Sequence, residues 1–430
     1  MLNRFFKLKE NQTSVKTEIL AGITTFMTMA YILAVNPDIL SATGMDKNAL
    51  FTATALSAMV ATLVMALVAR LPFALAPGMG LNAFFAFTVV LGMGYSWQFA
   101  LTAVFIEGII FLILTAFNIR ELIINAIPLS LKHAVSAGIG LFIAFIGLQN
   151  AGVVVNNEAT LVGLGDMGSP AVLVALGGIV LTAVLLAIKV KGALLIGIFT
   201  ATIAGLPFGV TQMPEGHLVG TPPSLSPIFF QFDFSQVFTI DMLIVLFTFL
   251  FVDMFDTVGT LVGVSDKAGM LTKEGKVPRA KQALFADSIG TTVGAMLGTS
   301  TVTTYVESAS GVAEGGKTGL TSLTTAGLFL VALFFAPLFT MVPPAATAAA
   351  LVLVGFFMMS PILKINFNDY TEAIPAFVTI IMMPLTYSIA EGIVFGMLSY
   401  VLLKILTGKY RDISVVMIIL AVLFILKFFI

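Results

Sequence analysis

The 430-residue sequence contains no cysteine and only two histidines. The chain therefore cannot form disulfide bonds, bind a metal through thiolates or use a thiol nucleophile, and two histidines leave little for a metal site. Only 10% of the residues are charged, and a net charge of −1 offers no basic surface for nucleic acid. These shortages exclude nucleic acid as a partner and predict a protein with no metal and no cofactor.

Hydrophobic residues, by contrast, make up 59% of the chain, and the mean hydropathy is +1.07. Apolar stretches of about 17–25 residues recur along almost the whole length, separated by short polar breaks, which is the pattern of a polytopic helical membrane protein. The chain leaves no room for a separate soluble domain. We therefore predict an all-α protein that crosses the cell membrane, inner or plasma, many times.

We predict about fourteen transmembrane segments in two sets of seven, followed by one extra apolar stretch. The first set lies near residues 18–36, 48–70, 77–92, 97–117, 132–150, 170–189 and 192–206. The second set lies near 240–263, 281–297, 303–315, 319–341, 344–360, 371–386 and 389–407, and the extra stretch is 413–429. Whether 413–429 crosses the membrane or lies at its surface stays open at this point.

Lysine and arginine gather in alternate loops, which is typical of the cytoplasmic loops of membrane proteins. The loops 151–169 and 207–239 contain neither residue, whereas the N-terminal segment and the loops on the other side contain most of them. The basic positions on that side are Arg70, Arg120, Lys189, Lys191, Lys267, Lys273, Lys276, Arg279, Lys281, Lys317, Lys364 and Lys409. This pattern predicts a cytoplasmic N-terminus.

The two halves of the chain show signs of an inverted repeat. Because each half has an odd number of spans, the second half enters the membrane from the opposite side. The stretch "ALFTATALSAMVATLVMAL" at 49–67 resembles "ALFADSIGTTVGAML" at 283–297, and each leads into a short, broken segment. The expected divisions are a first repeat at 1–206, an extracytoplasmic connection at 207–239, a second repeat at 240–407 and an extra segment at 408–430.

Two of the predicted spans cannot be continuous helices. "LAPGMGLNAFFAF" at 75–87 places Pro77 and Gly78 before a helix start, and "LGTSTVTTYVESASG" at 297–311 places a β-branched run before Glu307. Proline and glycine disrupt helices, and threonine and valine favour strands, so we expect each segment to be half strand and half helix. Paired broken segments in corresponding positions of two repeats indicate the binding site of a transporter.

Four polar residues lie on or beside these broken spans: Asn82, Asp253, Asp256 and Glu307. A charge at the centre of a bilayer costs about 2.5–3.5 kcal/mol, so acids at this depth usually mark a site or a pathway. Asp253 and Asp256 are three residues apart on one helix face and would repel each other if both were ionised. One acid of the set would then hold a proton at neutral pH, which is what a proton-coupled carrier needs.

The same residues also have structural alternatives. Asp256 could cap a broken helix or bond to Thr257 and Thr260, and Asn82 could satisfy backbone groups near the break. The other polar residues within or near spans, for which we expect structural roles, are Glu107, Glu391, His133 and His217.

The combination of "PGMGLNAFFAF", "FVDMFDTVGTLVG" and "TSTVTTYVESASGVAEGGKTGLTS" resembles the nucleobase/cation symporter-2 family, and within it the AzgA-like branch of hypoxanthine, guanine and adenine permeases. The resemblance covers essentially the whole chain. It implies two inverted seven-span repeats, with a core domain of spans 1–4 and 8–11 and a gate domain of spans 5–7 and 12–14. It also implies proton symport of a purine nucleobase by an elevator-like movement, and it allows a homodimer.

Matched motif by motif, the resemblance implies roles for five polar residues. Asp253 and Glu307 would be substrate-binding carboxylates, and Asn82 would be a substrate-binding amide. Asp256 would be a second acid for proton handling, and Asp287 in "LFADSIG" would be an acid that shapes the site. The wider family often has a histidine further along span 8, and its absence here favours the purine branch over uracil or xanthine carriers.

The chemistry of these side chains agrees with a purine substrate. An ionised carboxylate can accept hydrogen bonds from the N–H groups on one edge of guanine or hypoxanthine, and an amide can both donate and accept. Flat bases also stack on aromatic rings, for which Phe84 and Phe251 are the first candidates and Phe85 and Phe255 are within reach.

Other functions stay open at this point. A carrier of the same fold could take uracil, xanthine or an anion such as sulfate, but an anion site would want helix N-termini and a positive side chain rather than several acids. An intramembrane aspartyl protease needs two carboxyls from facing helices, whereas Asp253 and Asp256 share one helix. A channel is a further alternative. We expect a secondary transporter and not an enzyme.

Overall fold

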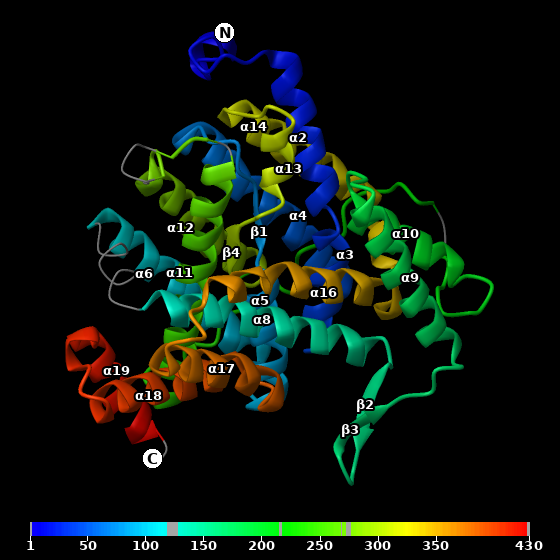
Figure 1. The fold of residues 1–430 in the computed structure, drawn as a ribbon. Helices are drawn as coiled ribbons and strands as arrows, with labels where there is room; N and C mark the ends of the chain where they lie inside the picture. Colours follow the sequence, from blue (N-terminus) through cyan, green and yellow to red (C-terminus); the bar gives the residue numbers. More distant parts are fainter. Residues whose placement is uncertain (1, 118–127, 215–216, 268, 272–276, 428–430) are drawn as a thin grey trace.

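A computed structural model describes residues 2–117, 128–214, 217–267, 269–271 and 277–427. Within these ranges the chain is mostly helical, and its short strands form two separate pairs (Figure 1). Three basic residues of the charge analysis, Arg120, Lys273 and Lys276, lie outside the described residues, as do the side chains of Phe255 and Lys267.

The helices of the first half begin where the sequence provides capping side chains. Ser14, Asp46 and Ser96 each accept a hydrogen bond from a backbone N–H three residues further on, which satisfies a group that the helix itself leaves free. The elements are α1 (Leu2–Phe5), α2 (Val15–Met29), α3 (Ile32–Ser41), α4 (Lys47–Val64), the π-helical η1 (Met65–Ala69), β1 (Leu75–Pro77), α5 (Met79–Ala83), the π-helical η2 (Phe84–Gly92), α6 (Trp97–Ala116), α8 (Leu129–Asn150), β2 (Val154–Asn157), β3 (Leu161–Leu164), α9 (Pro170–Ala187) and α10 (Ala193–Ala204).

The second half repeats the sequence of long helices, a strand with a short helix, and further long helices. Its elements are α11 (Ile240–Lys267), α12 (Ala280–Leu297), β4 (Val302–Thr304), α13 (Ser308–Ala313), α14 (Gly319–Ala332), the 3-10 segment η3 (Leu333–Phe335), α15 (Ala336–Thr340), α16 (Pro344–Met358), η4 (Ser360–Lys364), α17 (Tyr370–Leu385), α18 (Ile389–Leu406), η5 (Tyr410–Asp412) and α19 (Val415–Lys427).

The predicted fold class and the predicted broken spans are confirmed. Eight helical segments of the described chain are long and apolar enough to cross a membrane, and three further apolar helices, Met79–Gly92, Ala193–Ala204 and Tyr370–Leu385, are shorter. The predicted spans at 240–263 and 281–297 form the long helices α11 and α12. The structure adds two features that the sequence did not predict. The first span consists of two helices that meet at Ala30 and Tyr31, and the loop 151–169 contains the β2–β3 hairpin.

The extra C-terminal stretch forms α19, whose thirteen residues measure about 20 Å in length at 1.5 Å per residue. The hydrocarbon layer is about 30 Å thick, so the described residues of α19 are too few to cross it at right angles. Met417 and Ala421 face the protein, whereas Val415 and Ile418 are exposed. We therefore describe α19 as a helix that packs along the side of α18, which its contacts support.

The two broken spans meet in a buried antiparallel strand pair at the centre of the molecule (Figure 1). Ala76 of β1 lies opposite Thr303 of β4, and the backbone N–H of Gly78 continues the pairing by donating to the carbonyl of Thr301 at 2.9 Å. Pairing satisfies backbone groups that neither segment can satisfy as a helix, which irregular chain at membrane depth requires. The break in each half of the chain thus becomes the contact between the halves.

The helices form two sets that pack mainly within themselves. We call α2–α6 with α11–α14 the core set, and α8–α10 with α16–α18 the gate set. Small residues allow the close packing: the α carbons of Gly140 in α8 and Gly355 in α16 leave no space for a side chain, and Gly108 of α6 lies similarly against Thr292 of α12. The two sets correspond to the core and gate domains that the resemblance implied.

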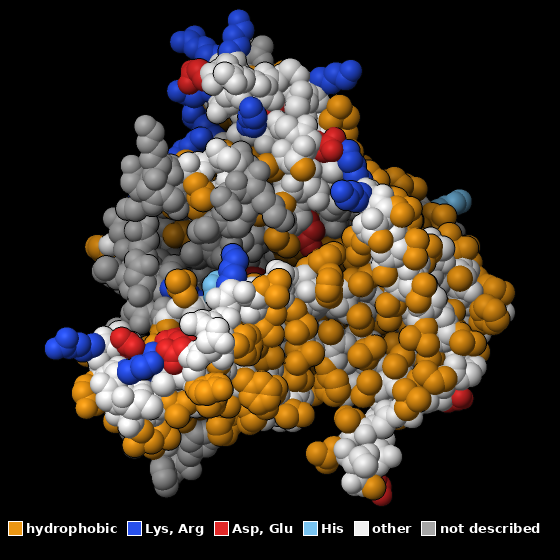
Figure 2. Space-filling model, in the orientation of Figure 1, with side chains coloured by type: hydrophobic (Ala, Val, Ile, Leu, Met, Phe, Trp, Pro, Cys, Tyr) orange, Lys and Arg blue, Asp and Glu red, His pale blue; other side chains and the backbone are white. Residues whose placement is uncertain are grey.

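The surface matches this arrangement. Figure 2 shows a broad hydrophobic face over the gate helices α9, α10, α16 and α17, and lysine and arginine around the N-terminal part of the molecule. The surface is hollowed between these two regions. Exposed apolar side chains on these helices include Leu173, Val180 and Phe377, which suits contact with lipid rather than water.

Candidate functional site

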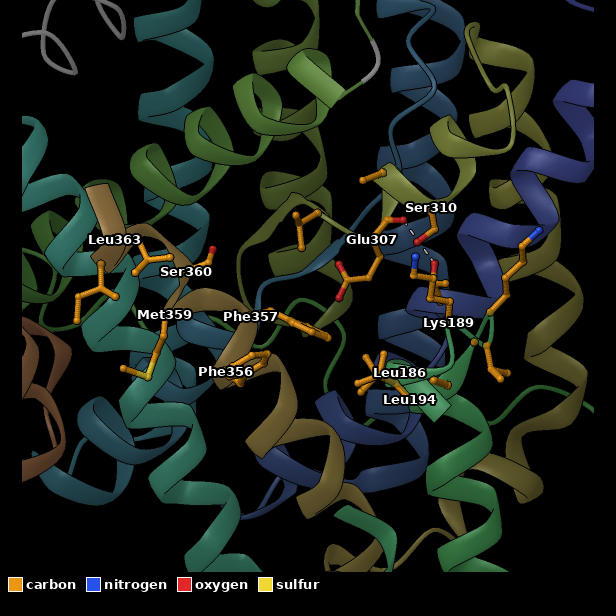
Figure 3. A pocket seen from close by; sticks show the side chains of 18 residues that line it. Leu186, Lys189, Leu194, Glu307, Ser310, Phe356, Phe357, Met359, Ser360 and Leu363 are labelled. Atoms are coloured by element: carbon orange, nitrogen blue, oxygen red, sulfur yellow. Dashed lines mark hydrogen bonds between the residues drawn. The ribbon is translucent and has the colours of Figure 1, made fainter. Parts of the chain in front are cut away.

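A cavity of about 930 Å³ lies between the two helix sets. Residues of α13 and Thr28 of α2 line it from the core set, and the α9–α10 turn and the end of α16 line it from the gate set. Figure 3 shows the Glu307 carboxylate pointing into this space, toward Phe357 of α16. Most other lining side chains are apolar. A cavity of this size with few polar groups is typical of a small-molecule site.

Glu307 owes its position to the break in its span. The chain leaves β4 at Thr304 and α13 begins at Ser308, so Glu307 directly precedes the helix and is partly exposed to the cavity. Its Oε1 accepts a hydrogen bond of 2.7 Å from the hydroxyl of Tyr31, which is buried at the junction of α2 and α3. The carboxylate is therefore held at the cavity wall by a group from the first span.

Asp256 lies next to the strand pair. Its Oδ2 accepts a long hydrogen bond of 3.4 Å from the hydroxyl of Thr303, and a side chain at Gly78 would come within 3.8 Å of the same oxygen. Asp256 is also close enough to Asp287 and Glu307 for their charges to interact. The sequence also allowed Asp256 to bond to Thr257 and Thr260. The hydrogen-bond partner seen in the structure is Thr303 instead.

Asp253 and Asp287 are joined through one hydroxyl group. The Thr257 Oγ1 lies 3.0 Å from Oδ1 of Asp253, one turn earlier on α11, and 2.7 Å from Oδ1 of Asp287 on α12. All three side chains are fully buried. The structure thus brings together two of the acids singled out from the sequence, but it places them behind the cavity wall rather than in the cavity.

Asn82, Phe84 and Phe251 also lie inside the core set and do not line the cavity. The Oδ1 of Asn82 accepts a hydrogen bond from the hydroxyl of Ser300, while its buried side-chain nitrogen has no partner among the described residues. Phe84 packs edge-on against Phe249 with ring centres 4.8 Å apart. In this conformation these three residues are not in contact with the space that Glu307 faces.

Two residues near Glu307 were not among the sequence predictions. Tyr31 lies in "MAYILAVNP". A polar hydroxyl group inside a predicted span, six residues before Pro37, is the feature of the sequence that could have indicated it. Phe357 had no signal, because it is one of 38 phenylalanines in an apolar helix. Its neighbour Phe356 also lines the cavity, and the two rings lie 5.8 Å apart.

Other buried acids have structural roles. Glu107 of α6 accepts a hydrogen bond of 2.6 Å from the hydroxyl of Thr301, which agrees with the structural role expected for it. Glu18, which the sequence analysis did not single out, accepts hydrogen bonds from the backbone and hydroxyl groups of Thr318 and Thr321 and so caps the start of α14. Glu391 lies in the first turn of α18.

Two inverted halves, two broken spans that meet at mid-molecule and a cavity between two helix sets together define a secondary transporter. Residues 16–395 match the family model described as "Permease family". The chain belongs to this family, the nucleobase/cation symporter-2 permeases, and is a transporter rather than an intramembrane protease.

Curated relatives resemble the chain over nearly its whole length. A putative permease of Methanocaldococcus jannaschii is 52% identical, with 99% of this chain and 98% of the relative covered. The guanine/hypoxanthine permease PbuG of Bacillus subtilis is 48% identical, with 99% of each covered. The adenine permease AdeP of Escherichia coli is 47% identical, with 99% of this chain and 96% of the relative covered.

Solved structures of lower sequence similarity share the fold. The transmembrane domain of the cyanobacterial bicarbonate transporter BicA superposes with a TM-score of 0.66 at 15% identity, covering 89% of this chain and 97% of that domain. The murine solute carrier 26 family member A9, an anion transporter in its inward-facing state, gives a TM-score of 0.64 at 12% identity and covers 90% and 68%. These likenesses concern the fold alone.

Proposed function

We propose that the protein is a proton-coupled symporter that imports a purine nucleobase such as hypoxanthine, guanine or adenine. The observation that carries the proposal is the Glu307 carboxylate, which faces a cavity of suitable size between the helix sets of a nucleobase permease. The named functions of relatives at 45–48% identity, which are adenine and guanine/hypoxanthine permeases, support the same substrate class.

Glu307 supplies the recognition chemistry. An ionised carboxylate accepts hydrogen bonds from adjacent N–H donors of a purine, and such charge-assisted bonds are the strong ones. Phe357, toward which the carboxylate points, offers an aromatic face from the gate set on which a flat base can stack. Asp253, Asn82, Phe84 and Phe251 are proposed as substrate contacts only in a conformation that opens the core set, because they are enclosed here.

The two ends of α16 differ in their contact with the core set, which supports alternating access. At its start, the hydroxyl of Thr347 donates to Asp38 of the core set at 2.9 Å, and Lys47 pairs with Asp38 and reaches the carbonyl of Val342. At its end, Phe357 faces the cavity. The two helix sets are therefore in contact at one end of α16 and apart at the other, as an elevator-like carrier requires in one of its states.

The orientation follows from the charge pattern. Lys189 and Lys191, which line the cavity, belong to a loop predicted to be cytoplasmic. With the N-terminus in the cytoplasm and the chain in the cell membrane, the cavity opens inward. Cysteines placed one at a time in this loop and in the β2–β3 hairpin, then labelled with an impermeant reagent in intact cells, check this orientation. A homodimer stays a prediction, which light scattering of the purified protein checks.

An anion carrier is the second candidate, because the two structural neighbours are a bicarbonate transporter and an anion transporter. Lys189 and Lys191 also line the cavity, although Lys191 is paired with Glu314. The acid at the cavity wall argues against an anionic substrate, since two negative charges in a poorly solvated site repel each other.

Uptake measurements test both candidates. Cells that express the chain are given radiolabelled hypoxanthine, guanine, adenine, uracil or sulfate, with and without a protonophore. We expect purine uptake that collapses with the protonophore. Glu307→Gln should weaken apparent affinity by about 10- to 100-fold, because hydrogen bonds to charged groups contribute about 1.5–3 kcal/mol.

The matched control is Glu158→Gln, the same chemical change on the exposed β2–β3 hairpin, which should leave uptake unchanged. Sulfate uptake without purine uptake would replace the proposal with the anion carrier. Purine uptake that survives Glu307→Gln would keep the transported substrate but remove Glu307 from its site.

A further inference from the structure

We propose that the transported proton is held by Asp253 and Asp287 together, with the hydroxyl of Thr257 between them, and that Thr257 is a positioning residue of proton coupling. This inference rests on the proposed symport of a purine and assigns its proton to a place apart from the cavity. It also changes the emphasis of the sequence prediction, which gave Asp256 the leading role in proton handling.

The Thr257 hydroxyl makes two contacts with carboxylate oxygens but has only one hydrogen atom to donate. Thr257 has one hydroxyl hydrogen, and its oxygen lies within hydrogen-bond distance of a carboxylate oxygen on each side, at 3.0 Å and 2.7 Å. One of these contacts is satisfied when Thr257 donates. The other is satisfied when the second acid is protonated and donates to the threonine oxygen. A single proton on the pair thus completes both hydrogen bonds.

Burial strengthens this requirement. Asp253, Thr257 and Asp287 have no exposed surface, and two ionised carboxylates around one hydroxyl would repel each other where water cannot screen them. Loading adds one proton to a carboxylate oxygen and lowers the charge of the pair from −2 to −1. Release breaks that O–H bond and restores the second charge. No other bond changes, so the step needs no further reactant.

The surrounding titratable groups are mostly acids as well. Asp256 lies on the same helix, Glu307 precedes α13 and Glu107 lies on α6, all on elements packed against α11. Basic residues on α11 and on the helices that contact it lie near helix ends: Lys267 is the last residue of α11, Arg279 precedes α12, and Lys132, His133, Lys281 and Lys404 lie on α8, α12 and α18. Lys281 donates to the carbonyl of Ala116, and Lys404 pairs with Glu372 and Asp412.

The position of the pair explains how proton and base can be linked although, in this conformation, the pair lies outside the cavity. Asp256 is one residue before Thr257 and interacts electrostatically with both Asp287 and Glu307. A proton on the pair removes a negative charge behind Asp256 and so favours an ionised Glu307, the form that accepts hydrogen bonds from a base. Proton loading should therefore raise the affinity for the base.

Reconstituted vesicles allow the two parts of transport to be measured separately. Counterflow, the exchange of labelled for unlabelled hypoxanthine at equal pH, needs substrate binding but no net proton movement. Accumulation against a gradient, driven by a pH difference, needs coupling. We expect Thr257→Val to keep counterflow and to lower accumulation by about tenfold, the effect of losing one hydrogen bond to a charged group. Thr257→Ser, which keeps the hydroxyl, should retain both.

A second variant covers the case in which Thr257→Val does not fold. Asp287→Asn keeps the shape, and its amide N–H can donate to the Thr257 oxygen in place of the proton, so Asp253 can stay ionised. We therefore expect counterflow that no longer depends on pH and no pH-driven accumulation. Accumulation at the unsubstituted level in either variant would overturn the proton assignment. A lack of purine counterflow in the unsubstituted protein would instead overturn the proposed function, so the two failures are distinguishable.

Discussion

The two broken spans occupy equivalent places in the two halves of the chain, but their surroundings differ. In the first, Asn82 and Phe84 are buried, and the gate helix α8 packs against the short helix α5. In the second, Glu307 and Val306 border the cavity, and Val306 is 46% exposed. The strand parts pair with each other and are both buried. The two broken spans therefore differ in the exposure of their helical parts and not in that of their strands.

This difference shows that repeat symmetry and function are separate properties. The inverted repeat explains why both halves contain a strand followed by a short helix, and why the two strands can pair. It does not make both helices part of the open cavity, because the gate helices cover one of them and leave the other accessible. In the structure, α8 contacts α5 through Ile139 and Gly80, whereas the end of α16 stays apart from Glu307.

The largest expected effect is a difference in chemical accessibility. Because the natural chain has no cysteine, single cysteines can be introduced without background. We expect Ser310→Cys, on the cavity wall, to react with a water-soluble thiol reagent, and Ala83→Cys, which is buried, to stay unmodified over the same time. Mass spectrometry of the purified variants measures the modified fraction. Equal labelling of both positions would mean that the two broken spans are equally open.

A smaller effect is expected where the two spans touch. A side chain at Gly78 would place its Cβ 2.3 Å from Cγ2 of Thr303, so Gly78→Ala forces Thr303 to rotate and to lose its bond to Asp256. Overpacking of this kind costs about 1–3 kcal/mol. The midpoint of thermal unfolding in detergent should fall.

The double variant Gly78→Ala with Thr303→Ala serves as the control, because it removes the clashing methyl group. We expect it to be more stable than the sum of the two single changes indicates. If the destabilisation of the double variant equals the sum of the two single changes, the contact between Gly78 and Thr303 is not what makes Gly78→Ala destabilising.

The smallest effect distinguishes two tyrosines. Tyr31→Phe removes the donor to Glu307 and should raise the KM for uptake by about fivefold, the equivalent of about 1 kcal/mol. Tyr305, whose hydroxyl donates to the carbonyl of Pro77 at 2.5 Å, links the two broken spans instead. Tyr305→Phe should lower stability by about 1 kcal/mol with an unchanged KM. A higher KM in both variants, or in neither, would contradict this division.

Much of the fold could be predicted from the sequence, because its signals are local. The helical stretches follow from apolar length, and their starts follow from capping residues such as Ser14 and Asp46. The broken spans follow from Pro77, Gly78 and the threonine-rich run before Glu307. The β2–β3 hairpin could not be predicted in this way, because its strands are only four residues long, are mostly exposed and show no alternation of apolar and polar residues.

The candidate site was predicted less completely. Glu307 and Asp253 could be found because acids on or beside a broken membrane span are rare, whereas Asp287 was indicated only by the family resemblance. Phe84 and Phe251 were chosen for their closeness in sequence, whereas the ring that faces Glu307 belongs to Phe357, fifty residues along the chain. Closeness in sequence is a poor guide when helices from distant parts of the chain pack together.

The sequence by itself determined that the chain is a membrane protein, which stretches form its spans, where two of them break and which acids lie at membrane depth. These properties depend on composition and on residues within a turn or two of each other. The tertiary structure alone decided that Tyr31 reaches Glu307, that Thr257 lies between Asp253 and Asp287, and that one broken span faces the cavity. Each of these depends on contacts between distant helices, whose approach is set by the packing of the whole molecule.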